Sequence, residues 1–286
     1  MSHEPAPSPS PFPSPSRTLR VCALYPDLLS IYADRGNLLV LERRCAWRGI
    51  GFQLRACGLG EPLSAGHDLL YLGGGQDRDQ RLCAEDLVRG KRAALHEAAA
   101  RGAVVLGICG GYQLLGHSYE LAPGERLPGV GLLDLTTVRA DGPRLIGNVT
   151  VAVSLGGGPE RVLAGFENHG GRTHLAAGQA PLGRVLRGHG NDGRSGFEGA
   201  RTGTVIGTYL HGPLLPKNAW FADWLIATAL GIDPGELAPL DDALEDAAHR
   251  LAQAKAGGAP RDEPAGARRG GPAGGPGRRQ ATAKRA

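Results

Sequence analysis

The sequence predicts an α/β fold with a mostly parallel central sheet, flanked by helices and accompanied by additional antiparallel strands. Three observations support this class. Before Pro128, apolar segments of strand length alternate with segments of helical period. The segment 103–108 is apolar throughout, which is typical of a parallel strand buried on both faces. After Pro128, short segments rich in β-branched residues alternate with glycines.

The elements before Pro128 follow one another as strands and helices. Each apolar run of four to six residues predicts a strand, and each run with helical spacing predicts a helix. The expected order is a strand at Leu19–Leu24, a helix at Asn37–Trp47, strands at Phe52–Ala56 and Leu69–Leu72, a long helix at about Ala84–Ala100 and a strand at Ala103–Ile108. Such alternation is typical of parallel strands joined by crossover helices.

The region after Pro128 is expected to complete the same sheet with antiparallel strands and crossovers. The predicted strands are Val130–Val138, Arg144–Val153, Arg161–Glu167 and Gly203–Leu210. A helix is then expected at Pro216–Leu230, where Trp220 and Trp224 recur at helical spacing and predict a core-facing stripe.

Both ends of the chain are expected to lie outside the folded unit. Residues 1–17 are rich in proline and serine, and residues 251–286 are a mixture of Gly, Pro, Ala and Arg without periodicity. This leaves residues 18–250 as one domain. The net charge of the chain is +4. Residues 255–286 include eight basic and two acidic residues and so carry +6, which leaves −2 for the rest of the chain. A slightly acidic body argues against a nucleic-acid-binding protein.

The chain shows no sign of a membrane span, a secretory signal or a metal centre. Its longest uncharged apolar run, Ala103–Gly116, is shorter than a bilayer-spanning helix needs, and the N-terminus has no apolar signal region. The five cysteines include no CxxC pair. These features predict a cytoplasmic protein with reduced cysteines and without a metal or cofactor.

Cys109 is the candidate nucleophile. It lies in Gly-Ile-Cys-Gly-Gly, residues 107–111, directly after the buried strand and before a short helical segment. Small neighbours permit a sharp strand-to-helix turn that exposes a nucleophile above the sheet. A helix N-terminus at this point favours the thiolate and leaves backbone N–H groups free to hold a developing oxyanion.

A cysteine nucleophile needs a base, and His211 is the best-placed histidine. It follows the apolar run Val205–Leu210, so it is expected at the carboxyl end of a strand, where open α/β sheets carry their functional groups. His169, within Glu-Asn-His-Gly-Gly-Arg, is the second candidate, as base or for binding. Cysteine and histidine at two strand ends are the minimum for acyl transfer through a thioester.

A second glycine cluster, Gly73–Gly75, also follows a strand. It does not continue into the GxxxxGK[ST] pattern of a nucleotide phosphate loop, and that pattern is absent from the whole sequence. We therefore expect Gly74 or Gly75 to supply a second backbone N–H to the oxyanion site.

With these features the sequence resembles a class I glutamine amidotransferase domain over nearly the whole folded unit. Within that class it is similar to the GatD-type glutaminase subunits of lipid II isoglutaminyl synthases, which are grouped with the cobyric-acid-synthase-like amidotransferases. The blocks that carry the resemblance are YADRGN (32–37), GGGQDR (73–78), GICGGYQ (107–113), ENHGGRT (167–173) and YLHGPLLPKN (209–218).

The resemblance implies a role for particular residues. Cys109 corresponds to the nucleophile and His211 to its base, while Gly110 and Gln113 fall in the substrate-binding segment. The arginine that grips the glutamine carboxylate corresponds best to Arg144, with Arg139 as the alternative, because a guanidinium can form two parallel hydrogen bonds to a carboxylate.

The implied reaction is hydrolysis of L-glutamine to glutamate and ammonia. The ammonia would pass to a Mur-ligase-like synthetase of the MurT type, which binds ATP and lipid II and amidates the D-glutamate of the stem peptide. Pro213 stands where the commoner pattern has the third catalytic residue, a glutamate, so the partner or Asp223 would have to orient His211. Two alternatives remain open: an amidotransferase for cobyrinate or another acceptor, and a non-enzymatic binding subunit with a degenerate site.

Overall fold

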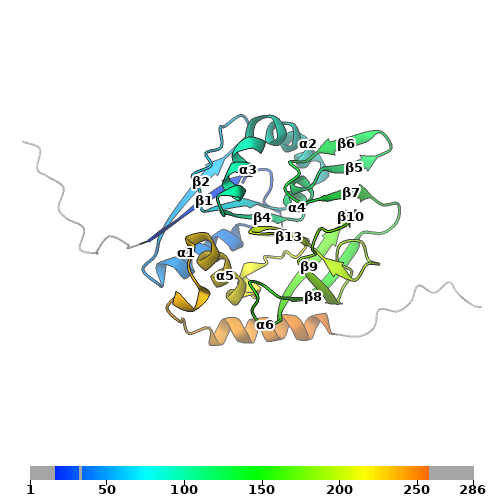
Figure 1. Ribbon diagram of the computed structural model, residues 1–286. Coiled ribbons are helices and arrows are strands. Elements are labelled where there is room, and N and C mark those ends of the chain that lie inside the picture. The colour runs from blue at the N-terminus through cyan, green and yellow to red at the C-terminus, as the bar shows by residue number, and fades with distance from the viewer. Residues whose placement is uncertain (1–16, 32–33, 258–286) are drawn as a thin grey trace, which may run out of the picture.

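The computed structural model describes residues 17–31 and 34–257 of the chain, and its centre is a six-stranded sheet (Figure 1). The strand order is β13-β14-β4-β3-β1-β2. All neighbours pair in parallel except β13, which lies antiparallel to β14 at one edge. The strands are β1 (Thr18–Leu24), β2 (Gly51–Cys57), β3 (Leu69–Leu72), β4 (Val104–Ile108), β13 (Ala200–Thr202) and β14 (Val205–Thr208). This confirms the predicted fold class.

Helices cover both faces of the central sheet, as crossover connections require. In Figure 1, α1 and α5 lie on one face, and α2 and α3 lie on the other. The helices are α1 (Arg35–Ala46), α2 (Asp77–Asp86), α3 (Arg92–Ala100), α4 (Gly110–Leu115) and α5 (Ala219–Leu230), with a π-helical turn at Leu87–Lys91 and a 3-10 turn at Leu215–Lys217. Every residue of β3, β4 and β14 is buried, so these central strands form the core.

The antiparallel strands do not complete the central sheet, and this part of the prediction is wrong. They form two separate four-stranded sheets, ordered β10-β7-β5-β6 and β12-β11-β8-β9, and only β13 and β14 return to the central sheet. The strands of the first sheet are β5 (Ser118–Ala122), β6 (Glu125–Pro128), β7 (Leu135–Arg139) and β10 (Gly171–Leu175). The strands of the second are β8 (Leu145–Val153), β9 (Arg161–His169), β11 (Gly183–Arg187) and β12 (Phe197–Glu198).

Two boundaries differ from the sequence prediction for identifiable reasons. The strand expected from Val130 begins only at Leu135, because the N–H groups of Val130, Leu132 and Leu133 bond back to the carbonyls of Leu114 and Leu115. The long helix begins at Asp77 instead of Ala84. Its first turn is polar and carries no apolar stripe, but acidic residues there are favourable at a helix N-terminus.

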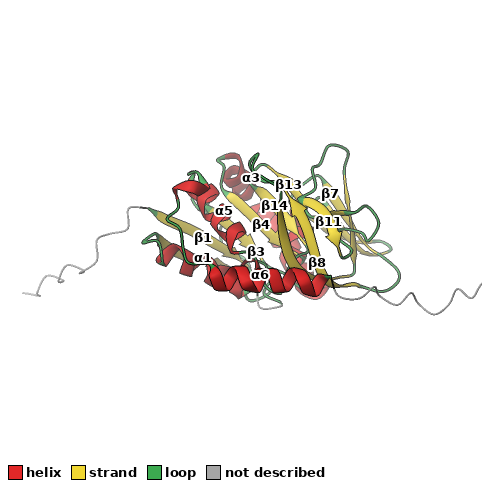
Figure 2. Ribbon diagram, turned by 90° about the horizontal axis from the view of Figure 1, so that it is seen from below, coloured by secondary structure: helices red, strands yellow, loops and turns green. Residues whose placement is uncertain are grey.

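The last helix, α6 (Ala243–Ala256), lies along the outer side of β8 (Figure 2). It continues six residues beyond the expected end of the domain at position 250. It also touches β9 and the 3-10 turn, where His249 Nδ1 lies 2.7 Å from the Lys217 carbonyl oxygen. The predicted tails fall mainly on residues 1–16 and 258–286, which lie outside the described part of the chain.

Candidate active site

Cys109 lies at the turn between β4 and α4. Its backbone has φ +49° and ψ −102°, a conformation that non-glycine residues rarely adopt and that is typical of strained functional turns. Its N–H donates to the Thr208 carbonyl oxygen at 2.8 Å, which extends the β4–β14 pairing by one residue. A Cβ on Gly111 would lie 2.4 Å from the Leu72 carbonyl oxygen, so the turn leaves no room for a larger residue there.

The surroundings of the Cys109 thiol favour its neutral form. Burial raises its pKa to about 12, and the nearby charge of Asp34 acts in the same direction, while Arg144 and a backbone hydrogen bond from Gly110 oppose it. The Gly110 hydrogen bond at the start of α4 acts in the direction expected of the helix N-terminus, but burial acts more strongly in the opposite direction. Helix α4 has only six residues, and desolvation of the charged sulfur outweighs its contribution. The thiol needs a base.

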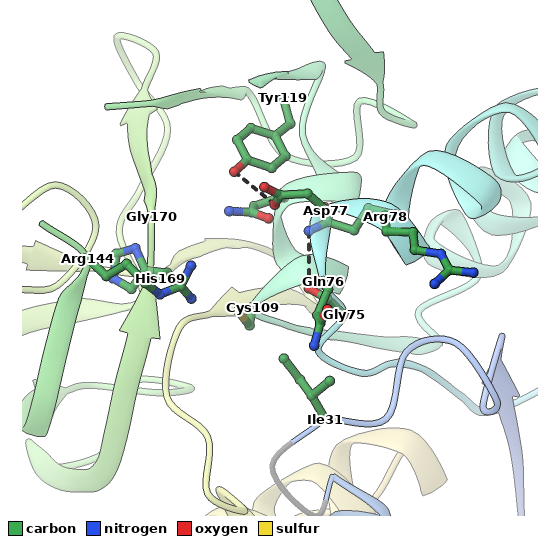
Figure 3. A pocket seen from close by; sticks show the side chains of 12 residues that line it. Ile31, Gly75, Gln76, Asp77, Arg78, Cys109, Tyr119, Arg144, His169 and Gly170 are labelled. Atoms are coloured by element: carbon green, nitrogen blue, oxygen red, sulfur yellow. Dashed lines mark hydrogen bonds between the residues drawn. The ribbon is translucent and has the colours of Figure 1, made fainter. Parts of the chain in front are cut away.

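A cavity of about 510 Å³ opens beside Cys109, and we call it the Cys109 cavity (Figure 3). This volume is in the range of small-molecule sites. In Figure 3, Arg144 and His169 lie on one side of Cys109, and Gly75 and Gln76 lie on the other. The lining residues are Ile31, Gly75, Gln76, Asp77, Arg78, Gln80, Cys109, Gln113, Tyr119, Arg144, His169 and Gly170.

The two glycines considered for the oxyanion site have different surroundings. The Gly74 N–H already donates to Asp34 Oδ2 at 2.5 Å, and Gly74 does not line the cavity. Gly75 lines the cavity and touches Gly110, since a Cβ on Gly110 would lie 2.8 Å from the Gly75 nitrogen. Gly75 is thus the glycine of this loop that lines the cavity, next to Gly110 of α4, and Gly74 instead anchors the loop to Asp34.

Asp34 is a residue that the sequence analysis missed as part of the site. It is 1% exposed, and burial raises its pKa to about 7. Its block, YADRGN, marked the resemblance, but nothing in the sequence placed its carboxylate against a loop 40 residues away.

His211 follows β14 and is held by its backbone. Its N–H and carbonyl pair with the carbonyl and N–H of Phe166 in β9, both at 3.0 Å. Thr208 of β14 pairs with Ile108, the residue before Cys109, and His211 follows Thr208 by three residues. Cys109 and His211 therefore both follow the ends of neighbouring strands. His211 is buried and does not itself line the Cys109 cavity. Burial lowers its pKa to about 4, with Lys217 and Arg144 acting in the same direction, so its imidazole is neutral at neutral pH.

Of the two candidate arginines, Arg144 reaches the cavity. Its Nε and Nη2 donate to the side-chain and backbone oxygens of Asn168, each at 2.7 Å, and these bonds fix the guanidinium plane. Arg139 pairs with Asp77 instead and does not line the cavity. Arg144 therefore has the geometry for gripping a carboxylate beside Cys109.

Comparison with known proteins agrees with this geometry. Residues 20–219 match the family described as the CobB/CobQ-like glutamine amidotransferase domain. The chain belongs to this family. The amidotransferase is 37% identical over 213 residues to the GatD subunit of glutamine-hydrolysing lipid II isoglutaminyl synthase from Streptococcus pneumoniae, covering 74% of this chain and 80% of that one. It is 38% identical over 204 residues to the GatD subunit from Staphylococcus aureus, covering 71% and 81% of the two chains.

A cobyric acid synthase from Pelotomaculum thermopropionicum is also similar to the amidotransferase. The two are 37% identical over 213 residues. This stretch covers 68% of the present chain but only 37% of the synthase.

Several cavity residues of the amidotransferase come from segments with no apolar pattern. Tyr119 donates to Asp77 at 3.3 Å, and Gln80 Nε2 donates to the Gly75 carbonyl at 3.3 Å. Gln113, which was expected to bind substrate, lines the cavity and donates to the Tyr209 hydroxyl at 3.1 Å. The described residues hold no cluster of three or more side chains suited to a metal, and none of their helices is long and apolar enough to cross a membrane.

Proposed function

We propose that this chain is the glutaminase subunit of a lipid II isoglutaminyl synthase. The observation that carries the proposal is the strained Cys109 turn, which opens on a cavity with Arg144 on one side and Gly75 on the other. An extended glutamine would place its amide between Cys109 and the glycines and its α-carboxylate at Arg144. The GatD relatives match over four fifths of their own length, which supports the choice of acceptor.

In the proposed reaction the Cys109 sulfur attacks the side-chain amide carbon of glutamine while His211 accepts the thiol proton. The N–H groups of Gly75 and Gly110 hold the negative oxygen of the tetrahedral intermediate. The intermediate collapses, His211 returns the proton to the leaving nitrogen, and ammonia departs. Water, activated by His211, then cleaves the thioester and releases glutamate.

Because Cys109 and His211 are both buried, both side chains are uncharged before glutamine binds in this mechanism. A thiol with raised pKa and an imidazole with lowered pKa form a neutral pair. The proton therefore moves as the sulfur attacks, when the developing charge lies on the substrate oxygen and is met by backbone donors. This arrangement leaves the sulfur weakly reactive until a carbonyl is positioned against it.

The ammonia is proposed to pass to a synthetase subunit of the Mur-ligase-like MurT type, which would use ATP to amidate D-glutamate in lipid II. The support is that the similar proteins from S. pneumoniae and S. aureus are themselves subunits of such a synthase. A cobyrinate acceptor is the second candidate, because the cobyric acid synthase match is equally identical, although over a smaller share of that protein.

The test is reconstitution with the candidate synthetase, ATP and lipid II. We expect the wild-type complex to form amidated lipid II from glutamine, and the Cys109→Ala complex to form it only when ammonium chloride is added. Amidation by the variant with glutamine as the sole nitrogen source would show that Cys109 is not the source of ammonia. Glutamine hydrolysis without lipid II amidation, together with amidation of cobyrinate, would favour the second candidate.

A further inference from the structure

His169, the last residue of β9, has no role in the mechanism above although it lines the Cys109 cavity. Its side chain is held on two sides. Nδ1 lies 2.8 Å from the Gly171 carbonyl oxygen, which can only accept, so Nδ1 carries the proton. The ring also stacks on Tyr209, with centroids 3.6 Å apart and planes 4° apart.

The other ring nitrogen of this cavity-lining residue, Nε2, has no hydrogen-bond partner in the described part of the chain. This nitrogen is buried. Burial lowers the pKa of His169 to about 3, and Gly171 only partly opposes this, so the ring is neutral and Nε2 is an acceptor. A buried acceptor left unpaired costs free energy, and its presence in a cavity indicates that a ligand donor completes it.

The position of His169 identifies that donor. Arg144 and His169 lie together on the side of Cys109 opposite Gly75 (Figure 3). If the carboxylate of glutamine is bound by Arg144, the ammonium on the same carbon lies within a few ångströms of the guanidinium. An ammonium has three donors and no acceptor, which suits a neutral imidazole nitrogen.

We propose that Nε2 of His169 accepts a hydrogen bond from the α-ammonium of glutamine. This bond favours glutamine over the same molecule without its α-amino group. This inference rests on the proposed glutaminase function. Asp77 is the carboxylate that lines the cavity, but its two oxygens already accept from Tyr119 and Arg139. Gln80 Oε1 is a second buried acceptor without a partner among the described residues, but Gln80 is bonded to Gly75, on the side of Cys109 opposite Arg144.

The experiment compares two ligands that differ only in the α-amino group, L-glutamine and glutaramate. Binding is measured by calorimetry on the full chain carrying Cys109→Ala, which prevents turnover, with and without His169→Asn. Asparagine can keep a donor near the position of Nδ1 but has no atom at Nε2. His169→Phe is a second variant, which keeps a flat ring against Tyr209. His174→Asn, at an exposed position on β10, is the matched control.

We expect both His169 variants to raise the dissociation constant for glutamine by about 10- to 100-fold, the range for losing a hydrogen bond to a charged group. The constant for glutaramate should change less than about twofold, and His174→Asn should change neither. Equal weakening of both ligands, or unchanged binding of both, would overturn the inference. If the parent Cys109→Ala chain bound no glutamine, the proposed function itself would fail. The unfolding temperature of each variant is measured in parallel. If one His169 variant is misfolded, the dissociation constants of the other test the inference.

Discussion

The Cys109 N–H donates to the carbonyl oxygen of Thr208, so the nucleophile is tied to the strand that leads to His211. This bond has two consequences. It holds the Cys109 turn against the end of β14. It also occupies the N–H of Cys109, so this group is not available to bind an oxyanion. The backbone donors proposed for that task are those of Gly110 and Gly75, which lie against one another beside Cys109.

The first prediction concerns Cys109. Cys109→Ala and Cys109→Ser should abolish glutaminase activity while leaving the fold intact, because an unactivated hydroxyl does not replace a thiol nucleophile. Steady-state ammonia release measures this, with circular dichroism as the fold control. More than about 10% residual rate would contradict the assignment, since losing a nucleophile costs several orders of magnitude.

The second prediction separates Arg144 from Arg139. Arg144→Ala should weaken glutamine binding by removing a charge-assisted contact, while the thiol stays intact. An electrophilic glutamine analogue should then label Cys109 slowly, whereas a small generic alkylating agent should label it at the wild-type rate. Arg139→Ala is the matched control, because its guanidinium pairs with Asp77 and does not itself line the cavity. A selective loss in the control instead would move the carboxylate site to Arg139.

The third prediction concerns pH. His211 must be neutral to accept a proton, and burial lowers its pKa from the ordinary 6.5 to about 4. Because protonation removes the base, kcat/KM for glutamine should stay level as the pH falls through 6.5 and decline only near pH 4. The profile from pH 4 to 8 is measured with tryptophan fluorescence as a check on folding. A decline centred between pH 6 and 7 would show that the base is solvated or is another group.

The fourth prediction follows from Pro213, which stands where a glutamate would orient the histidine. Asp223, the alternative within the chain, is held by Arg44 at 2.5 Å and by Arg48 at 2.8 Å, so its carboxylate is committed elsewhere. A partner that supplies the carboxylate should raise the glutaminase rate roughly tenfold or more, equivalent to about 1.4 kcal/mol. Rates with and without purified synthetase decide this. Equal rates would mean that His211 is oriented from within this chain.

The fifth prediction concerns packing beneath the nucleophile. Gly111→Ala would place a Cβ 2.4 Å from a backbone carbonyl and should destabilise the fold by about 1–3 kcal/mol. Gly90→Ala is the matched control, because its Cβ would meet only Asp86 Oδ1 at 3.7 Å within a helical turn. The control should be neutral or slightly stabilising. Urea unfolding of both variants measures the difference, and similar values would contradict the close packing.

The central sheet and its nucleophile could be predicted because each rests on a local pattern. The run Val104–Ile108 is apolar, and the glycines around Cys109 follow it directly. The two separate four-stranded sheets could not be predicted, since alternation within a strand does not identify its partner. The hairpin Ser118–Pro128 was missed for a related reason, because charged residues such as Glu120 and Glu125 interrupt its apolar pattern.

The residues of the candidate site could be predicted only where they follow a strand end or match the resemblance. Strand ends indicated Cys109 and His211, and the resemblance indicated Arg144. Asp34, Asp77 and Tyr119 join the site through contacts between distant segments, which no single stretch of sequence encodes. The thiol pKa was also beyond local reasoning, because it depends on how completely the folded chain excludes water from Cys109.

The path of the chain between α4 and β13 has an evolutionary consequence. Residues 116–199 contain the two four-stranded sheets, and the chain then returns through β13 at the edge of the central sheet to β14, the neighbour of β4. Because β14 pairs with β4 directly, this segment can lengthen, shorten or diverge without separating the turn of Cys109 from the strand that precedes His211. Arg144 and His169 both belong to it. Substitutions in this segment thus alter the side chains beside Cys109 while the paired strands that carry the nucleophile and His211 stay in place.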